Sequence, residues 1–279
     1  MITEQLQKKI DRAVKLLQSV ANCYDGEIEV AYSGGKDSDV ILQLAKESGI
    51  RYRAIYKNTT IDPPGTVKHC KDKGVEILMP KQSFFQLVKS KGYPSRRARF
   101  CCQELKEYKV LDRCIMGVRR SESKAREERY TEPTQCRVYE NTGEHVNAIY
   151  PILDWTNDDV RDFILDRGIQ CHPLYYDEQG AFHVERRLGC IGCPLAYKKK
   201  RINEFKKYPK FVKAWVKAGQ TYLNTHPQTV AARTYANGAE FFVRTVYFDY
   251  NREYDEFMNN LFGKTDCKKF LEDYFNITL

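Results

Sequence analysis

Long hydrophobic runs are missing from this sequence of 279 residues. No stretch approaches the ~20 uninterrupted apolar residues that a membrane-spanning helix needs. The first segment, Met1–Ala21, also lacks the apolar core of a secretory signal peptide, because "KKIDRAVKLL" places charges throughout it. Internal repeats and low-complexity segments are absent as well. We therefore expect a soluble cytoplasmic protein with no membrane partner.

A reducing compartment excludes disulfides as the reason for the cysteines, because thiols stay free there. The chain nevertheless contains 10 cysteines. Metal binding or redox chemistry is therefore the leading hypothesis for them. The formal net charge of +9 favours anionic partners such as nucleotides or nucleic acid.

Strand-like and helix-like segments alternate along the first half of the chain. The strand-like segments are Glu27–Tyr32, Tyr52–Tyr56, Val75–Met79 and Cys114–Val118. Helical patterns occur in Met1–Ser19, after Ser38, between Pro64 and Gly74, and after Thr156. This alternation predicts an α/β fold with a doubly wound parallel sheet, whose ligands bind at the carboxyl ends of the strands.

The chain becomes basic and helical after Lys198. We therefore predict a nucleotide-binding domain over residues 1–200 and a basic helical extension over residues 201–279. The extension begins with Tyr197–Gly219, where lysines alternate with aromatic residues. Such a pattern can bind nucleic acid. The interpretation we favour for the aromatic residues is an amphipathic helix pair, broken near Pro209, with Phe205, Tyr208, Val212 and Trp215 in the core.

The segment Ser33–Ser38, "SGGKDS", lies where the first predicted strand passes into a helix. Gly34 and Gly35 allow the backbone to bring several N–H groups close to one anion, and the N-terminus of the helix adds partial positive charge. A phosphate fits this description, although the spacing differs from that of the P-loop. The alternative is a tight turn that needs glycine for its geometry only.

Arginines follow another of the predicted strands. Arg119 and Arg126 lie in "GVRRSESKAR", directly after Cys114–Val118. Guanidinium groups suit the oxygens of phosphate or sulfate. Alone they would be ordinary solvated charges, but beside a phosphate loop they become candidate nucleotide-binding residues.

The "SGGKDS" segment resembles the PP-loop of the adenine nucleotide α-hydrolase superfamily. Five further stretches narrow the resemblance to the phosphoadenosine phosphosulfate (PAPS) reductase family, and they occur in the family's order. They are "NTTIDPPGTVKH", "RFCCQELK", "GVRRSESKAR", "HPLY" and "GCIGCPLA". The resemblance implies the Rossmann-like fold of that superfamily and an adenine nucleotide, either ATP or the sulfonucleotides PAPS and APS, as the ligand.

The resemblance also implies roles for the loop residues. Ser33, Gly34 and Gly35 would bind the nucleotide through the loop, and Lys36 would hold the β and γ phosphates together with Mg²⁺. Asp37 is the candidate for organising the metal and the loop, which makes Lys36 and Asp37 the predicted catalytic residues. Ser38 would contact a phosphate at the start of the helix.

Four cysteines form a second candidate site. Cys190 and Cys193 form a C-x-x-C turn before a proline, which suits zinc, an iron-sulfur cluster or a redox pair. Cys101 and Cys102 are adjacent, so their side chains diverge, and a cuboidal cluster tolerates this better than one zinc ion does. In the cluster-bearing branch of the family, typified by APS reductases, the same pattern binds a 4Fe–4S cluster. We predict this cluster, with zinc as the alternative.

The remaining cysteines have simpler interpretations. Cys136 or Cys171 could replace one member of the adjacent pair. Three others, in apolar or helical surroundings, are predicted to be small buried residues. They are Cys23, Cys70 and Cys114.

One motif of the reductases is missing, namely a C-terminal Glu-Cys-Gly followed by an aliphatic residue and histidine. Cys267 is the only late cysteine, and its neighbouring lysines make it either an activated thiolate or an ordinary residue on a charged surface. A complete loop with cluster cysteines but without this tail resembles the sulfur-transfer members, such as DNA phosphorothioation proteins of the DndC type and tRNA thiolases. ATP sulfurylase subunits share the loop, but the cluster cysteines argue against them.

The resulting prediction is an ATP-dependent sulfurtransferase that adenylates an acceptor and replaces the AMP with sulfur. DNA or tRNA are the candidate acceptors, and a cysteine desulfurase or a thioredoxin-like protein is the candidate donor partner. One alternative is a sulfonucleotide reductase that releases sulfite from PAPS or APS. Another is a zinc-containing nucleic-acid-binding module with a vestigial nucleotide loop.

Overall fold

The computed structural model describes residues 2–140, 142–249, 253–260 and 263–279. The chain forms two compact units that are interleaved along the sequence. The first comprises Met1–Asn58, Pro63–Met79 and Gln103–Gly189, and the second comprises Thr59–Asp62, Pro80–Cys102 and Cys190–Leu279. The domains predicted from the sequence divide the chain only once, after residue 200, and that division stays a prediction.

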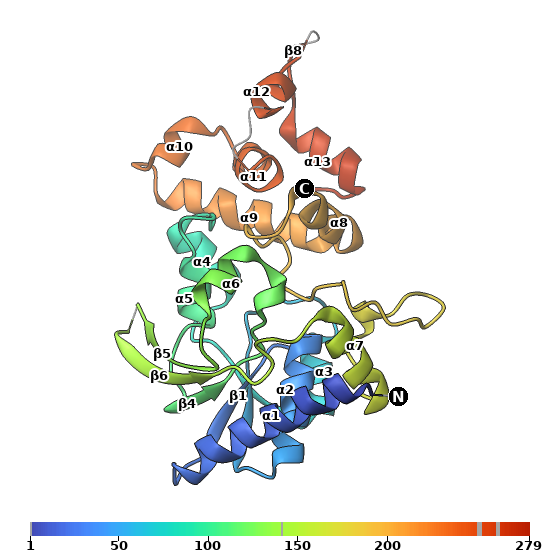
Figure 1. The fold of residues 1–279 in the computed structure, drawn as a ribbon. Helices are drawn as coiled ribbons and strands as arrows, with labels where there is room; N and C mark the ends of the chain where they lie inside the picture. The colour runs from blue at the N-terminus through green and yellow to red at the C-terminus, as the bar shows by residue number, and fades with distance from the viewer. Residues whose placement is uncertain (1, 141, 250–252, 261–262) are drawn as a thin grey trace. The chain divides into compact units, whose positions relative to one another are not determined.

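A six-stranded sheet forms the centre of the first unit, in the order β3-β2-β1-β4-β6-β5 (Figure 1). Every pairing is parallel except that of β5 with β6. The predicted α/β class with a mainly parallel sheet is confirmed. The strands are β1 (Ile28–Tyr32), β2 (Tyr52–Lys57), β3 (Glu76–Leu78), β4 (Arg113–Ile115), β5 (Thr134–Tyr139) and β6 (Glu144–Ile149).

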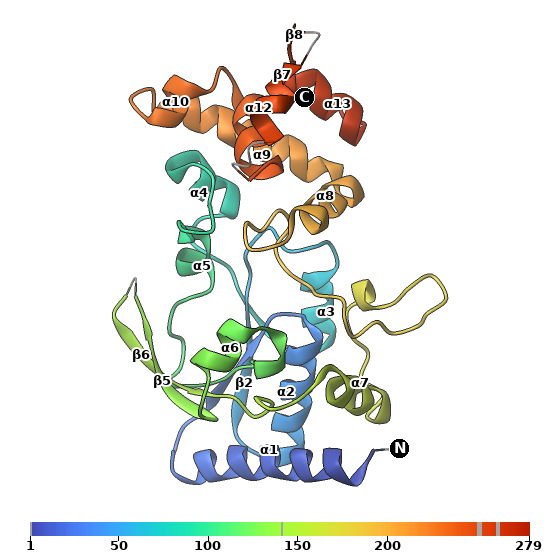
Figure 2. The ribbon, with the colours of Figure 1, turned by 45° about the horizontal axis from the view of Figure 1, so that its top comes forward.

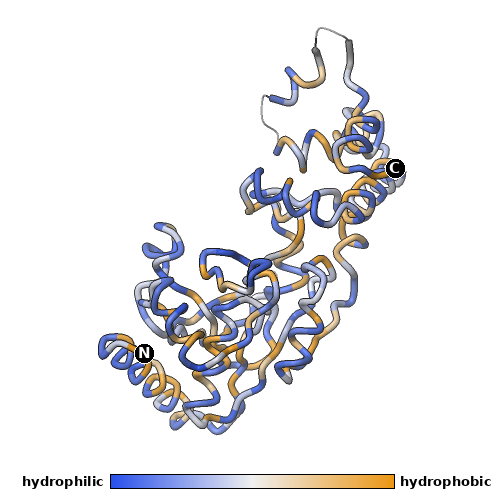
Figure 3. The backbone as a smooth tube through the Cα atoms, turned by 90° about the vertical axis from the view of Figure 1, so that its right-hand side faces the viewer, coloured by the Kyte–Doolittle hydropathy of each residue, from blue (hydrophilic) through white to orange (hydrophobic). Residues whose placement is uncertain are grey.

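Alternate residues of β1 point to opposite faces of the sheet. Ile28 and Val30 are fully buried on the face covered by α1 (Glu4–Asn22) and α2 (Lys36–Ser48), which lie side by side in Figure 1. The opposite face carries Glu29 and Ala31. Figure 3 shows helices banded in blue and orange, as expected for helices with one apolar face.

Local signals account for the ends of several helices in the first unit. Thr156 caps α7 (Asn157–Asp166) through a capping box with Asp159, which confirms the helix predicted there. Gly49 ends α2 in the left-handed conformation, with φ of 68°. The helix expected after the two prolines is α3 (Thr66–Asp72). The remaining helical segments here are η1 (Arg120–Glu122), α6 (Lys124–Arg129) and η2 (Pro173–Tyr175).

The sheet differs from the sequence prediction in two details. The segment Cys114–Val118 pairs only as far as Ile115, because the Val118 N–H bonds to the Met116 carbonyl and turns the chain away from the sheet. The hairpin of β5 and β6 was not predicted at all. β5 is exposed along most of its length, and its sequence does not alternate regularly between apolar and polar residues.

The second unit is mainly helical, and α9 (Pro209–Thr225) contacts α4 (Phe84–Lys91), α8 (Lys198–Lys207) and other helices (Figure 2). The predicted break at Pro209 is confirmed. Phe205, Val212 and Trp215 are buried as expected, whereas Tyr208 is only half-buried because it lies at the junction of the two helices.

The remaining elements of the chain are short. They are α5 (Phe100–Leu105), α10 (Val230–Thr234), α11 (Gly238–Phe242), the π-helical η3 (Val243–Tyr247), α12 (Glu253–Met258), β7 (Asn259–Asn260), β8 (Gly263–Lys264) and α13 (Cys267–Phe275). Among the residues that the structure describes, no helix combines the length and the apolar character needed to span a membrane.

Candidate functional site

The "SGGKDS" segment comprises the turn after β1, which ends at Tyr32, and the first three residues of α2, which begins at Lys36. Gly34 adopts φ of 76°, and Gly35 precedes the helix without providing a side-chain cap. The Ser33 hydroxyl accepts a hydrogen bond from the Gly35 N–H at 3.4 Å, and the Ser38 hydroxyl donates to the Gly35 carbonyl at 2.6 Å. These bonds stabilise a turn that faces the N-terminus of α2, where an anion is favoured.

Replacing Gly34 with alanine is expected to weaken pyrophosphate binding and to lower the free energy of unfolding by about 1–2 kcal/mol, from the left-handed backbone alone. The new Cβ would also lie 3.0 Å from Thr66 Cγ2 and 3.2 Å from Leu188 Cδ2. Gly180→Ala is a matched control, because Gly180 has φ of 82° but no heavy atom within 4 Å of an added Cβ. Denaturant unfolding and calorimetry should show strain in both variants and a binding defect in Gly34→Ala alone. Equal pyrophosphate affinity of the two variants would contradict the role of the turn.

Lys36, Asp37 and Arg119 form a buried charged group at the loop. The Asp37 carboxylate lies between two cations, 2.9 Å from Lys36 Nζ and 2.7 Å from Arg119 Nε. Arg119 is 1% exposed and also donates to Asn157 Oδ1 at 3.0 Å. Burial lowers the pKa of Lys36, while the neighbouring carboxylate of Asp37 opposes this shift. The structure therefore places three of the predicted site residues together, with Asp37 as the shared partner.

Arg126 adds further positive charge near this group. It pairs with Glu122, and burial followed by the nearby Arg187 lowers the pKa of Arg126. Arg187 lies 3.5 Å from Glu122 and also interacts electrostatically with Lys36. The sequence analysis missed Arg187, for which the only signal was a pair of arginines just before the C-x-x-C turn.

A segment after α7 packs against the loop. Tyr175 Oη would lie 3.4 Å from a Cβ added at Gly35, and it accepts a hydrogen bond from the Leu188 N–H at 3.3 Å. The backbone N–H of Lys36 also bonds to this tyrosine. The sequence analysis used "HPLY" only as a family motif and gave Tyr175 no role. The backbone N–H of Lys36, in the first turn of α2, is therefore hydrogen-bonded within the protein.

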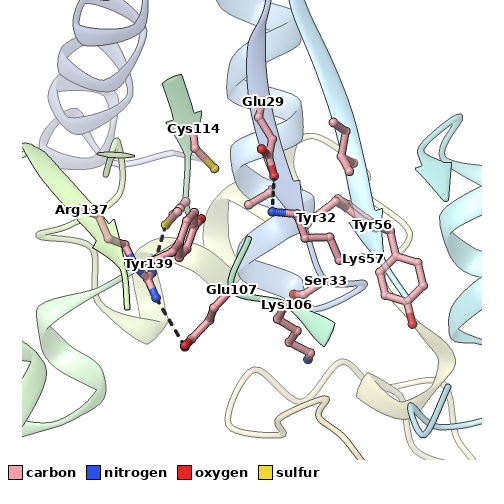
Figure 4. Close-up of a pocket in the computed structure, with 13 residues that line it drawn as sticks. Glu29, Tyr32, Ser33, Tyr56, Lys57, Lys106, Glu107, Cys114, Arg137 and Tyr139 are labelled. Atoms are coloured by element: carbon pink, nitrogen blue, oxygen red, sulfur yellow. Dashed lines mark hydrogen bonds and ion pairs between the residues drawn. The ribbon is translucent and has the colours of Figure 1, made fainter. Parts of the chain in front are cut away.

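A cavity of about 220 Å³ lies on the sheet face opposite α2 and borders Ser33 (Figure 4). Glu29, which is 1% exposed, pairs with Lys57 Nζ at 3.1 Å on one side of it. Arg137 lies 3.5 Å from Glu107 on another side. The other lining residues are Ala31, Tyr32, Ile55, Tyr56, Lys106, Cys114, Met116 and Tyr139. The sequence did not predict this cavity, because most of its lining residues come from separate strands and loops.

The four predicted cluster cysteines all belong to the second unit. Each is half-buried. A hydrogen bond with Cys102, then burial, then the nearness of Cys190 and Cys193 raise the pKa of Cys101. The structure therefore brings the four thiols into one neighbourhood. Within the described parts of the chain, no three His, Cys, Asp or Glu side chains are arranged to hold a metal ion.

The chemistry around the C-x-x-C turn suits a negatively charged group. Gly192, at φ of 76°, packs so closely on the core that a Cβ would lie 2.6 Å from Phe205 Cζ. Arg201 is 2% exposed and donates to the Pro194 carbonyl at 3.4 Å. Among the residues that the structure describes, its Nε and Nη2 have no hydrogen-bond partner, although Nη2 lies 3.4 Å from Asp249. A buried guanidinium with spare donors beside the turn is compatible with thiolates bound to a metal or a cluster.

The other cysteines divide into those that match the sequence analysis and those that do not. Cys70 and Cys114 are buried as predicted, but Cys23 is exposed because it lies just after the last turn of α1. Cys136 and Cys171, the possible substitutes, belong to the first unit, where Cys136 contacts His145 at 3.6 Å. Cys267 is buried with its sulfur 3.5 Å from that of Met258.

Comparison with known proteins gives several related sequences. An uncharacterized protein of Methanocaldococcus jannaschii is 29% identical over 226 residues, which are 76% of this chain and 52% of that protein. An uncharacterized 37.8 kDa protein of Escherichia phage 186 is 36% identical over 155 residues, which are 49% of this chain and 42% of that protein. The chain thus spans about half the length of these two relatives. Sulfate adenylyltransferase subunit 2 of Shewanella pealeana is 26% identical over 62% of this chain and 68% of that protein.

Solved structures with a similar course of the chain include phosphoadenylyl-sulfate (PAPS) reductase from Candida auris. Its TM-score is 0.47 at 14% identity, over 68% of this chain and 96% of that one. NH3-dependent NAD synthetase from Campylobacter jejuni has a TM-score of 0.43 at 12% identity, over 83% and 97% of the two chains. The sequence model of the phosphoadenosine phosphosulfate reductase domain matches residues 27–196, from the first strand through the C-x-x-C turn. Because this match covers more than half of the sequence, the chain belongs to the phosphoadenosine phosphosulfate reductase domain family.

Proposed function

We propose that the protein is an ATP-dependent enzyme that adenylates an acceptor and then exchanges the AMP for sulfur. The observation that carries the proposal is the complete "SGGKDS" turn at the start of α2, with Lys36 and Arg119 buried at its side. A buried cation beside a helix N-terminus favours a ligand with several negative charges. The triphosphate of ATP is such a ligand.

The cavity next to Ser33 is the proposed binding place for the nucleoside half of ATP. It lies at the same turn as the proposed phosphate site, and Ile55 and Met116 give it apolar walls. Tyr56 and Tyr139 add aromatic surface on which a base can pack. We propose that the adenine base binds in this cavity, with the phosphates directed along the loop.

In the proposed first step, an acceptor oxygen attacks the α-phosphorus, the bond to the β-phosphate oxygen breaks, and pyrophosphate leaves. In the second step, a sulfur nucleophile forms a bond to the acceptor carbon or phosphorus as the bond to the AMP oxygen breaks. The residues act mainly by positioning and by stabilising charge. Lys36 and Arg126 would neutralise the leaving pyrophosphate, and Arg119 would hold Asp37 in place. Asp37 is the candidate for organising Mg²⁺, which when bound would neutralise further phosphate charge.

We propose that Cys101, Cys102, Cys190 and Cys193 hold a 4Fe–4S cluster, with zinc as the alternative. The support is the grouping of the four thiols: the pKa of Cys101 is raised by its hydrogen bond with Cys102, by burial and then by the nearness of Cys190 and Cys193. Metal binding would release the thiol protons, because a cysteine binds a metal as the thiolate. A bound cluster would supply soft sulfur and redox chemistry, and the sulfur donor would be a cysteine desulfurase or a thioredoxin-like partner.

The proposal is tested by ATP–pyrophosphate exchange in the presence of candidate acceptors, including DNA and tRNA. Acceptor-dependent exchange is the expected result. The alternative function, reduction of PAPS or APS, would instead give sulfite without exchange. The burial of Cys267 beside Met258 favours the first outcome, because a nucleophilic thiolate needs access to its substrate. Sulfite release in the absence of any exchange would overturn the proposal.

A further inference from the structure

The positive charge of the chain is concentrated in α8 and α9 of the second unit. Residues 198–225 contain nine lysine or arginine residues and one acidic residue, Glu204. This segment therefore carries a formal charge of +8, against +9 for the whole chain. The steps proposed at the phosphate loop make no use of this charge. Such a concentration of one sign favours an anionic partner.

Lys210, Lys213 and Lys217 form a row on α9. Their spacing of three and four residues places them on one face of the helix, over about 10 Å of its length. All three are exposed, while Val212 and Trp215 are buried on the other side of the helix. Among the described residues, none of the three lysine side chains forms an ion pair or a hydrogen bond, whereas three cations of α8 lie beside carboxylates. The charge of this row is therefore available to a partner.

A groove of about 490 Å³ borders the row. Its cations are Lys213 and Lys217 from α9 and Lys268 from α13, whose charge is partly balanced by Glu272 at 4.0 Å. Between them, α11 packs against both α9 and α13 (Figure 1). At Gly238 this packing is so close that an added Cβ would lie 2.5 Å from a backbone oxygen of α9. The close contact fixes one wall of the groove.

The amide side chains in the groove present donors rather than acceptors. Gln220 Oε1 accepts a hydrogen bond from the Gly238 N–H at 2.8 Å, and Gln220 Nε2 donates to Asn224 Oδ1, also at 2.8 Å. Asn237 Oδ1 accepts from the Glu240 N–H at 2.9 Å where it caps α11. The amide oxygens are thus engaged. Within the described part of the chain, the Nδ2 groups of Asn224 and Asn237 remain as donors in the groove.

This lining suits the phosphates of a nucleic-acid duplex. Proteins hold phosphate oxygens with lysine, asparagine and glutamine side chains, and these oxygens only accept hydrogen bonds. Among the described residues, no aromatic side chain lines the groove, and Phe205 and Trp215 are buried in the core. Single strands are bound largely by stacking of their bases on aromatic side chains. A duplex, whose bases are already stacked on one another, therefore fits better than a single strand.

The same features favour DNA over other polyanions. A protein distinguishes RNA by its 2′-hydroxyl groups, which donate as well as accept hydrogen bonds, and the amide oxygens that could accept from them are engaged here. Binding to an anionic membrane needs apolar side chains that insert beside the lysines. The exposed residues of α9 are all polar, namely the three lysines of the row, Asn224 and Thr225.

We propose that the groove lined by α9, α11 and α13 binds the phosphate backbone of double-stranded DNA. Lys213 and Lys217 are the main charged contacts, and Asn224 is a hydrogen-bond donor beside them. Contacts to phosphates fix the position of a duplex without reading its sequence, so this surface holds DNA of any sequence. The inference goes beyond the chemistry proposed at the phosphate loop and does not depend on it.

The test is the affinity of the full chain, purified without oxygen, for a short DNA duplex of mixed sequence. Fluorescence anisotropy between about 50 and 200 mM salt gives the affinity and its salt dependence. The variant with both Lys213→Gln and Lys217→Gln should bind about tenfold more weakly at low salt. The slope of log affinity against log salt should become smaller by about two, because two phosphate contacts are lost. Glutamine preserves the helix, since its helix propensity is close to that of lysine.

Asn224→Asp tests the donor in the groove. Aspartate keeps an acceptor for Gln220 Nε2 but replaces the Nδ2 donor with negative charge. Binding of the duplex should weaken in this variant while the unfolding midpoint stays unchanged. Unchanged affinity of Asn224→Asp would exclude this wall of the groove from the DNA contact.

The variant with both Lys15→Gln and Lys46→Gln is the matched control. These two lysines are exposed on α1 and α2 of the first unit, so their replacement lowers the net charge equally. It should keep the salt slope of the unchanged protein, and equal weakening in the two double variants would overturn the inference. Tighter binding of a single strand or of an RNA duplex would overturn it as well, as would binding to phosphatidylserine vesicles without binding to DNA.

The phosphate loop is tested separately from this surface. Lys36→Ala should keep its affinity for the DNA duplex, because Lys36 belongs to the first unit. No binding of the duplex by the unchanged protein would overturn the DNA surface and leave the proposed adenylation standing. Loss of ATP–pyrophosphate exchange with full DNA binding would have the opposite meaning.

Discussion

Alanine at position 36 is expected to reduce ATP–pyrophosphate exchange by about 10²–10³-fold, the usual cost of removing one group that stabilises developing charge. Lys36 Nζ is buried at the loop and pairs with Asp37 at 2.9 Å. Asp37 pairs with two cations, Lys36 and Arg119. Without Lys36, only Arg119 of these two would balance the Asp37 carboxylate beside the proposed phosphate site. Binding of pyrophosphate should therefore weaken together with the rate, because in the proposed mechanism this cation contacts both ATP and the leaving group.

Lys46→Ala is the matched control for this variant. Lys46 lies in the last turn of the same helix and is exposed, so its loss changes the net charge equally without touching the loop. Exchange kinetics and pyrophosphate affinity should be close to normal in Lys46→Ala. Retention of full exchange by Lys36→Ala, in a protein with an unchanged unfolding midpoint, would exclude the loop as the site of the chemistry.

The loop was predictable because its signal is local. Two glycines between a strand and a helix, followed at once by lysine, aspartate and serine, indicate an anion-binding turn, and the six residues of "SGGKDS" are consecutive in the sequence. The position of Arg119 at this turn was also predictable, because parallel strands end at a common edge of the sheet. β4 pairs directly with β1, so the chain that follows each strand emerges at the same edge.

The buried partners of the loop were not predictable, because they depend on contacts between distant segments. His69 contacts Asp39 and Tyr32, which lie 30 and 37 residues away in the sequence, and no spacing rule links them. Glu29 and Lys57 likewise meet only because β1 and β2 are adjacent in the sheet. In the sequence each of these residues reads as an ordinary polar position, and only the pairing of elements buries them.

The cysteine group combines a feature that a local sequence pattern predicts with features that depend on contacts between distant segments. The C-x-x-C turn was predictable from its spacing and from the proline that follows it. The nearness of Cys101 to that turn was expected only from the resemblance, since the two segments are far apart in the sequence. The burial of Arg201 beside Pro194 was not expected at all, because "KKKR" reads as a solvated basic face.

Serine at position 193 is expected to remove the iron and the labile sulfide from protein purified without oxygen, from about four of each per chain to almost none. Four thiolates complete the coordination of such a cluster, and serine is too hard a ligand to replace one of them well. The measurement is iron and sulfide content together with the visible absorption spectrum. The same loss is expected for Cys101→Ser, because the two cysteines belong to one group of thiols.

Cys136→Ser is the matched control, because Cys136 is exposed on β5 in the first unit and contacts His145 rather than the cysteine group. It should keep its full content of iron and sulfide. About one zinc ion per chain without sulfide, lost in Cys193→Ser and kept in Cys136→Ser, would assign the same four residues to the alternative metal. If neither metal is present in the unchanged protein, the four thiols are not a metal site. The proposed sulfur transfer would then have to obtain its sulfur from a partner protein alone. The adenylation step would stay testable, because the ATP–pyrophosphate exchange assay needs no sulfur donor.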